Sequence, residues 1–174
     1  MAESWRTVRI TIDEHTIATT DDPMVIIDPV WWLSDFYHGL DEYEKSLAQF
    51  TKAQRQVWAV LWFDSEVCNG GFHQFFSNST GAVWPEALEG FEAMELMQAH
   101  QLLHDAVERM GGSPSLDGTE RNTQLHNVCP DFDDLDDGYY KLIEEMDFAA
   151  AIMKFIRGRP QDFYFSGDVR KPVA

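Results

Sequence analysis

Residues 66–81, EVCNGGFHQFFSNSTG, place two adjacent glycines between segments with helical spacing of apolar side chains. Residues 51–68 have the pattern of a mostly buried helix, and Asn69 with Gly70 suits a left-handed C-cap that would end it. The residues after the glycines predict a second, short helix that turns three phenylalanines toward the core: Phe72, Phe75 and Phe76. The stretch therefore predicts a helix, a sharp joint and another helix around one core.

The rest of the sequence predicts a single, mainly helical domain over residues 1–174, with its helical core at 28–110 and 131–158. No repeat and no linker divides the chain. At the N-terminus, residues 7–12, TVRITI, alternate with the period of a β-strand. A return strand directly after them would make residues 1–20 a small β-hairpin.

Helix boundaries are expected where capping residues occur. Asp28 and Pro29 match the N-cap and first position of a helix, and Gly39 matches its end. A further helix is expected to start near Asp41. Residues 84–110 carry apolar side chains at intervals of three and four, which is typical of one long helix.

The chain carries 30 acidic and 13 basic side chains, which gives a formal net charge of −17 at pH 7. Because 44% of its residues are hydrophobic, this charge belongs to a folded protein and not to a disordered acidic tail. Such a charge repels nucleic acid and anionic membranes, and it attracts basic protein surfaces. Only two cysteines, no signal-peptide pattern and no apolar run long enough for a bilayer together favour a cytoplasmic protein.

The negative charges are concentrated in two segments. Residues 13–44 hold nine acidic side chains and no Lys or Arg, and residues 131–147 hold eight, with Lys141 as the single basic residue. Carboxylates three or four positions apart on a helix repel each other, so such clustering does not serve stability; it indicates a binding surface or a solvated face that keeps the protein soluble. The candidates for contact with a basic partner are Asp35, Asp41, Glu42, Glu44, Asp131, Asp133, Asp134, Asp136 and Asp137.

The opening stretch also carries a family signature. Its members are Glu66, Asn69, Gly70, Gly71, Phe72, Gln74, Phe75, Phe76, Asn78, Ser79 and Gly81. This pattern resembles that of a family of small acidic bacterial proteins that was formerly a domain of unknown function. The later segments LDDGYY and MKFIRGRPQDF resemble its C-terminal half. A characterised member of that family is a dimeric DNA mimic, which occupies the DNA-binding surface of a helix-turn-helix transcription factor.

The resemblance implies a regulator without catalytic activity and without a cofactor. It implies a homodimer whose partner is a basic DNA-binding protein, such as a helix-turn-helix repressor. The signature residues themselves are interpreted as structural, so the resemblance assigns no binding role to them. A compact chain of this length is about 40 Å across, and one side of B-DNA of that length presents roughly 12 phosphates. The net charge has the size needed to imitate that face.

Calcium binding is an alternative hypothesis. Residues 133–144, DDLDDGYYKLIE, place Asp133, Asp137, Gly138 and Glu144 as an EF-hand loop would. Leu135 stands where such a loop needs a side-chain oxygen, so the preferred interpretation is an acidic helix start that complements the helix dipole.

A third hypothesis is a small-molecule enzyme centred on Glu66 and His73, although no nucleophile is paired with a base in this segment. His100 and His104 have the spacing of two metal ligands on one helix, but the sequence offers no evident third ligand. They are interpreted as surface histidines, and no metal is expected.

Overall fold

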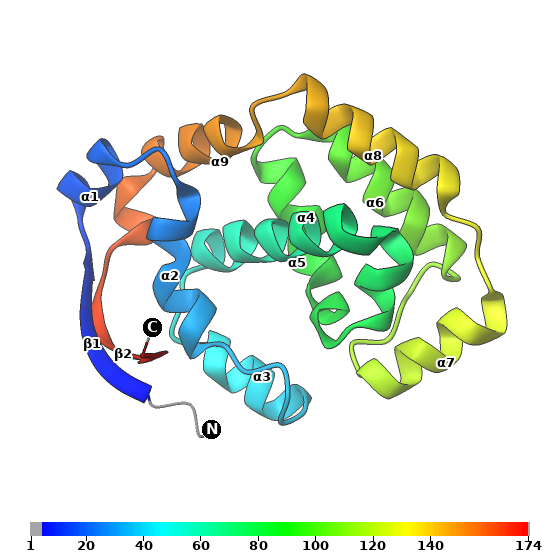
Figure 1. Ribbon diagram of the computed structural model, residues 1–174, viewed down its shortest axis with the longest axis horizontal. Coiled ribbons are helices and arrows are strands. Elements are labelled where there is room, and N and C mark those ends of the chain that lie inside the picture. Colours follow the sequence, from blue (N-terminus) through cyan, green and yellow to red (C-terminus); the bar gives the residue numbers. More distant parts are fainter. Residues whose placement is uncertain (1–4, 174) are drawn as a thin grey trace.

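Helix α4 (Lys52–Ser77) runs through the middle of the computed structural model, which describes residues 5–173, and the other helices pack around it (Figure 1). The helices before it are α1 (Glu14–Thr19), α2 (Pro23–Leu33) and α3 (Leu40–Leu47). Those after it are η1 (Ser79–Val83), α5 (Trp84–Ala93), α6 (Met97–Arg109), α7 (Gly118–Val128), α8 (Asp133–Glu145), α9 (Phe148–Arg157) and η2 (Pro160–Phe163), of which η1 and η2 are 3₁₀ helices. The mainly helical fold predicted from the sequence is confirmed.

The start of α4 is fixed by a reciprocal pair of hydrogen bonds. The hydroxyl of Thr51 accepts from the Gln54 amide at 3.1 Å, and the Gln54 side chain accepts from the Thr51 amide at 2.9 Å. Both amides lie too early in the helix to reach a helical carbonyl, so the pair satisfies them. From this start, α4 carries the fully buried Trp58 and Phe63 into the centre of the core.

A two-stranded antiparallel ribbon joins the two ends of the described chain. β1 (Trp5–Ile12) pairs along its whole length with β2 (Phe165–Pro172). The strand predicted at residues 7–12 is confirmed, but the hairpin predicted for residues 1–20 is wrong. Asp13 follows β1 directly, and its carboxylate accepts a hydrogen bond from an amide of the next turn at 2.8 Å. This cap starts α1 where the hairpin needed a return strand.

The boundaries predicted for the second helix are also wrong. Asp28 and Pro29 lie inside α2, which begins earlier, at Pro23. Asp22 is the N-cap, and its carboxylate accepts from an amide of the first turn at 2.9 Å. Asp22-Pro23 and Asp28-Pro29 both satisfy the local rule for a helix start. A start at Asp22-Pro23 adds a turn of buried apolar residues to α2. Gly39, with a φ of 97°, precedes α3 and does not end α2.

Two helices replace the single helix predicted for residues 84–110. Between α5 and α6, Glu95 has a φ of 60°, in the left-handed region where helices commonly end. Glycine usually takes this position, and its absence here left the break unmarked in the sequence. The helix expected near Asp41 is α3, and the segment 131–158 forms α8 and α9 as predicted.

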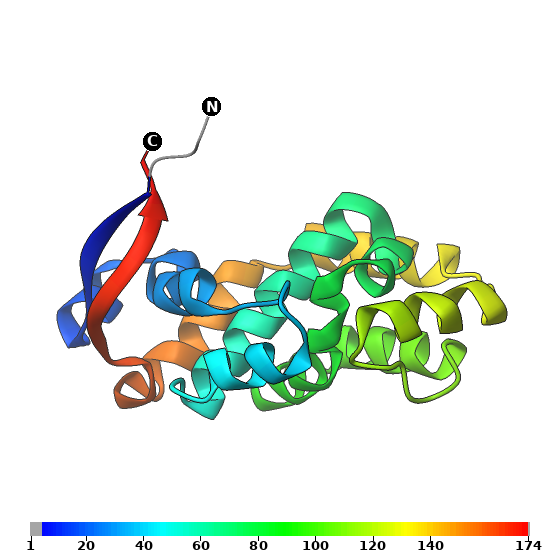
Figure 2. The same cartoon turned by 90° about the horizontal axis from the view of Figure 1, so that it is seen from below.

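The ribbon stands at one end of the molecule and α7 at the other, with α4 between them (Figures 1 and 2). Within residues 5–173, no helix combines the length and the apolar content that a bilayer crossing requires. Residues 1–4 and 174, which the prediction of one domain over 1–174 includes, lie outside the described residues.

Candidate functional site

The two adjacent glycines of the signature form a kink inside α4. Gly70 has a φ of −161° and Gly71 a φ of 72°, so the helix stops and restarts here. The left-handed residue is Gly71, and not Asn69 or Gly70 as the sequence predicted. The amide of Phe72, at the start of the second half, donates to Asp136 Oδ1 at 2.8 Å. Asp136 therefore caps this half of α4 from the neighbouring helix α8.

The missing side chain of Gly71 makes room for this cap, because a Cβ there would overlap the Asp136 carboxylate. Partial burial raises the pKa of Asp136, and the charges of Asp133, Asp137 and Asp134 raise it further. Asp136 was predicted from the sequence to be one of the carboxylates that contact a partner. In the structure it is half-buried and serves the fold.

Glu66 is buried beside the kink and accepts three side-chain hydrogen bonds. Its Oε2 accepts from Gln74 Nε2 and from Asn78 Nδ2, each at 2.8 Å, and its Oε1 accepts from Thr80 Oγ1 at 2.6 Å. Both oxygens have partners, as a buried carboxylate requires. These contacts tie the first half of α4 to the second half and to η1. Asn69, by contrast, is exposed.

The three phenylalanines of the signature are fully buried: Phe72, Phe75 and Phe76. Phe63, from the first half of α4, meets the rings of Phe72 and Phe75 edge to face, with centroids 5.4 Å and 5.0 Å away. This arrangement is favourable for aromatic rings beyond the area it buries. The predicted return of the second helix to the core is confirmed.

Arg121, on α7, is fully buried against the end of α4, and no sequence pattern pointed to it. Gly81 makes room for it, because a Cβ there would crowd the guanidinium. Burial lowers the pKa of Arg121 to about 10, so the side chain stays charged at neutral pH. The guanidinium donates to five main-chain carbonyl oxygens, those of Phe76, Asn78, Ser79, Ser115 and Leu116.

The residues of the enzyme hypothesis do not form a pair. His73 is exposed and lines a hollow of about 240 Å³ together with His126 and Cys129. Glu66 does not line this hollow, and both of its oxygens are occupied by the hydrogen bonds described above. A shared catalytic role for Glu66 and His73 therefore has no support in this geometry.

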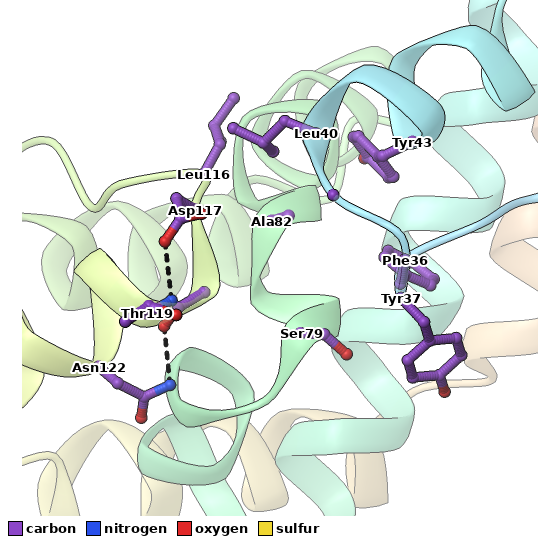
Figure 3. Close-up of a pocket in the computed structure, with 12 residues that line it drawn as sticks. Phe36, Tyr37, Leu40, Tyr43, Ser79, Ala82, Leu116, Asp117, Thr119 and Asn122 are labelled. Carbon is purple, nitrogen blue, oxygen red and sulfur yellow. Dashed lines mark hydrogen bonds between the residues drawn. The ribbon is translucent and has the colours of Figure 1, made fainter.

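Another hollow, of about 350 Å³, lies between the loop before α3, η1 and the start of α7 (Figure 3). Its aromatic lining consists of Phe36, Tyr37 and Tyr43. On the opposite side, Asp117 accepts from the Thr119 amide and Asn122 donates to the Gly118 carbonyl, both at 2.9 Å. These polar groups already have partners within α7, and neither residue of the enzyme hypothesis lines the hollow.

The calcium-loop interpretation of residues 133–144 is wrong, because these residues lie in the continuous helix α8. An EF-hand loop must leave the helical path to wrap its oxygens around the ion. Among the described residues, no group of three or more His, Cys, Asp or Glu side chains is placed to hold a metal ion. His100 and His104 lie one turn apart on α6, with ring centroids 6.3 Å apart.

The predicted partner-binding carboxylates near α8 differ in their surroundings. Both oxygens of Asp134 accept from Arg109, at 2.5 Å and 2.7 Å, and Asp131 Oδ1 accepts from the Asp133 amide at 3.0 Å. Asp133 and Asp137 are exposed, and their carboxylates belong to no ion pair within residues 5–173. Of the carboxylates predicted here, these two have the most freedom to meet an outside cation.

The carboxylates predicted around α3 include a similar free pair. Asp35 accepts from the Tyr37 amide at 2.9 Å and contacts His38 Nδ1 at 2.7 Å, which holds it in the loop before α3. Glu42 forms an ion pair with Lys45 at 3.1 Å, one turn away. The exposed Asp41 and Glu44 have no ion-pair partner in the described part of the chain.

The nine predicted carboxylates do not form one surface. In both views α3 and α8 lie on opposite sides of α4 (Figures 1 and 2). Two acidic residues near the ribbon are paired: Asp28 with Lys171, and Asp21 with Arg157 at 2.6 Å.

The model of the DMP19-like protein family matches residues 48–159, more than half of the chain. The chain belongs to this family. The match runs from the turn before α4 to just beyond α9, so it includes the whole signature, the buried Arg121 and the carboxylates of α8. The ribbon and α1–α3 lie outside the part that defines DMP19-like proteins. No curated protein and no solved structure shows significant similarity to the chain.

Proposed function

We propose that this protein is a DNA mimic that acts in the cytoplasm without catalysis. Its acidic surface binds the DNA-binding face of a transcription factor, in the simplest case a helix-turn-helix repressor, and keeps that factor from its operator. Three features support the proposal: the net charge of −17, the resemblance of the signature to a family with a characterised DNA mimic, and the row of free carboxylates on α8.

The row on α8 is the observation that carries the proposal. Asp133, Asp137 and Glu144 are separated by four and seven positions, so they share one face of the helix. All three are exposed, and none belongs to an ion pair among residues 5–173. Lys141 is the single basic residue of α8, and its ammonium lies 3.9 Å from Glu145, so it leaves Asp133, Asp137 and Glu144 without an ion pair among the residues that the structure describes.

The size of this row suits a stretch of DNA backbone. From Asp133 to Glu144 the helix axis rises about 16 Å, and B-DNA carries roughly ten phosphates over that length, about five of them on one side. The exposed carboxylates of α8 are Asp133, Asp134, Asp137, Glu144 and Glu145, of which Asp134 pairs with Arg109 and Glu145 with Lys141. Over this length, a surface shaped to neutralise phosphates with Lys and Arg would therefore meet three charges that are unpaired within the described residues.

In the test, the protein is immobilised and exposed to lysate of its host, and bound partners are then released with duplex DNA. With the partner that DNA releases, the triple variant Asp133→Asn, Asp137→Asn, Glu144→Gln is expected to bind about 10–100-fold more weakly. This corresponds to three exposed ion pairs at about 0.5–1 kcal/mol each. Binding of the wild-type protein should also fall steeply with salt, because screening weakens each pair.

The matched control is the triple variant Asp41→Asn, Glu42→Gln, Glu44→Gln. It also removes three negative charges, but from α3, on the opposite side of α4. This variant should keep most of the affinity, and both variants should keep the melting temperature of the wild type. Normal binding by the α8 variant together with weak binding by the α3 variant would move the site to α3. Full affinity in both variants would reject DNA mimicry through these helices.

We also propose that the protein is a homodimer. Trp5 on β1 and Val25 on α2 are 46% and 42% exposed, which is unusual for large apolar side chains. Trp32 lies two turns beyond Val25 on α2, and its ring meets that of Trp5 edge to face at 6.2 Å. Together they form an apolar stripe away from the α8 carboxylates. A second copy of the chain is the proposed cover of this stripe.

Sedimentation equilibrium should therefore give a mass of about 40 kDa, twice the 20.0 kDa of one chain. The variant Trp5→Lys, Val25→Lys should sediment as a monomer with an unchanged far-ultraviolet circular dichroism spectrum, because charges buried at an interface are costly. A wild-type protein that stays at 20 kDa at high concentration would contradict the proposal.

A further inference from the structure

An apolar groove lies at the end of α8, between its last turn and the turn that joins α5 to α6. It has a volume of about 320 Å³, and its apolar lining consists of Leu96, Met97, Ala99, Leu142 and Met146. Met97 is 54% exposed, which makes it one of the most exposed large apolar side chains of the described residues. Methionine is flexible and polarisable, and exposed methionines are common on surfaces that bind apolar side chains of other proteins.

The margin of this groove holds a residue in an unfavourable backbone conformation. Glu95 ends α5 in a Schellman motif: its amide donates to the Glu92 carbonyl at 3.0 Å, and the Leu96 amide donates to the Phe91 carbonyl at 2.8 Å. The φ of Glu95 is 60°. Such strain in a non-glycine residue is concentrated at binding sites, where the side chain has a use that the fold alone does not require.

The same molecule shows the unstrained form of this motif. At the end of α6, the equivalent left-handed position is occupied by Gly111, with a φ of 97°. Glycine takes this conformation without a steric cost. The comparison isolates what Glu95 adds to its motif, which is a carboxylate at the edge of an apolar groove.

The charge around the groove is negative on the side of α8. Glu95 lines the groove and belongs to no ion pair within the described residues, and Glu144 and Glu145 occupy the last turn of α8. On its other side, Glu95 borders a separate hollow that contains Lys154 and Arg159. The acidic margin of the groove therefore consists of Glu95 and of Glu145, which also pairs with Lys141 at 3.9 Å. Asp133, Asp137 and Glu144 lie on the face of α8 opposite Leu142.

We propose that the groove receives apolar side chains from a basic amphipathic helix of a partner protein, whose Lys and Arg side chains meet Glu95 and Glu145 at the margin of the groove. The inference rests on the proposed function and adds to it a second, uncharged point of contact. An apolar groove with a charged margin is the usual receptor for an amphipathic helix. The apolar anchor would provide affinity that salt does not screen, whereas the carboxylates provide attraction and orientation.

The test uses protein labelled with ¹³C at its methionine methyl groups and a synthetic amphipathic helix of Leu and Lys as the probe. The methyl signals of Met97 and Met146 are expected to shift on titration. Those of Met110 and Met153 are buried controls, and that of Met24, 36% exposed on α2, is an exposed control. A peptide with the same Lys residues and Gln in place of Leu should leave the Met97 and Met146 signals unchanged.

Two variants sharpen this test. Met97→Gln should weaken binding of the Leu/Lys helix at least tenfold and leave binding of the Lys/Gln peptide unchanged. Glu95→Gly should raise the melting temperature by about 2–4 °C, since it relieves the left-handed strain, and should still weaken the Leu/Lys helix. A purely structural Glu95 would give the same gain in melting temperature with no loss of binding.

The inference is overturned if Met24 shifts as much as Met97, or if Met97→Gln binds the Leu/Lys helix normally. It is also overturned if the Met97 and Met146 signals shift with protein concentration alone, because the groove would then be covered by a second copy. The α8 triple variant shows whether a negative result concerns the groove alone or the proposed function as well. If the triple variant loses the DNA-released partner while Met97→Gln retains it, DNA mimicry stands without the groove. If the triple variant binds that partner normally, DNA mimicry fails.

Discussion

Replacement of Arg121 by Met is expected to lower the free energy of unfolding by about 4 kcal/mol or more. The variant removes all the donors that satisfy five main-chain carbonyl groups at the end of α4 and in the loop before α7. Each buried carbonyl left without a donor costs about 1–3 kcal/mol. Relief from burying the charge offsets part of this loss, since burial lowers the pKa of Arg121. Urea denaturation followed by circular dichroism measures the difference.

Two further arginine variants make this result specific. Arg121→Lys keeps the charge but cannot reach five acceptors spread around a planar fork, so it should recover only part of the loss. Arg157→Met removes an exposed arginine that pairs with Asp21 and donates to the Thr20 carbonyl at 2.7 Å, and should cost no more than about 1–2 kcal/mol. If Arg121→Met were as stable as Arg157→Met, the joint at the end of α4 would not depend on this guanidinium.

Gly71→Ala is expected to destabilise the protein by about 3 kcal/mol. About 1–3 kcal/mol comes from forcing a residue with a Cβ into a φ of 72° and a ψ of −178°, a region that is essentially restricted to glycine. A further 1–2 kcal/mol or so comes from the Asp136 carboxylate, which the new methyl group would displace from the Phe72 amide. Thermal and urea unfolding of the two proteins give the value.

A double-mutant cycle with Asp136 separates these two contributions. Asp136→Ala already loses the cap, so Gly71→Ala should cost only the backbone strain in that background. Asp136→Asn keeps an acceptor for Phe72 and should be as stable as wild type or more stable at pH 7. The pKa of Asp136 is raised in the fold, so its ionised form is the disfavoured one, and its unfavourable contribution should disappear as the pH falls. Additive costs in the cycle would show that Asp136 does not cap α4.

Local sequence signals predicted those parts of the fold that depend on neighbouring residues. The core face of Phe72, Phe75 and Phe76 follows from helical spacing, and the same spacing predicted the buried helix of residues 51–68. The hairpin failed because the partner of β1 lies at the other end of the chain, where no local pattern can reveal it. The start of α2 failed because two Asp-Pro pairs obey the same rule, and burial of the turn between them decides which one is used.

The candidate site shows the same division between what is local and what is not. The sequence indicated that α8 is rich in carboxylates, but only the folded chain shows that Asp136 is committed to Phe72 and Asp134 to Arg109. Arg121 escaped notice because arginines are nearly always exposed, and its acceptors come from two separate segments. Glu95 escaped notice because a left-handed glutamate has no sequence signal.

The ribbon of β1 and β2 has a consequence for the synthesis of the chain. About 150 residues separate β1 from its partner strand, residues 165–172, so β1 is synthesised well before that strand. At roughly 5–20 residues per second, β1 waits about 10–30 s for that partner. During this time its row of amides and carbonyls is an open template for other nascent chains. A chain whose synthesis ended just before residue 165 would contain all the helical residues, but β1 would have no partner strand.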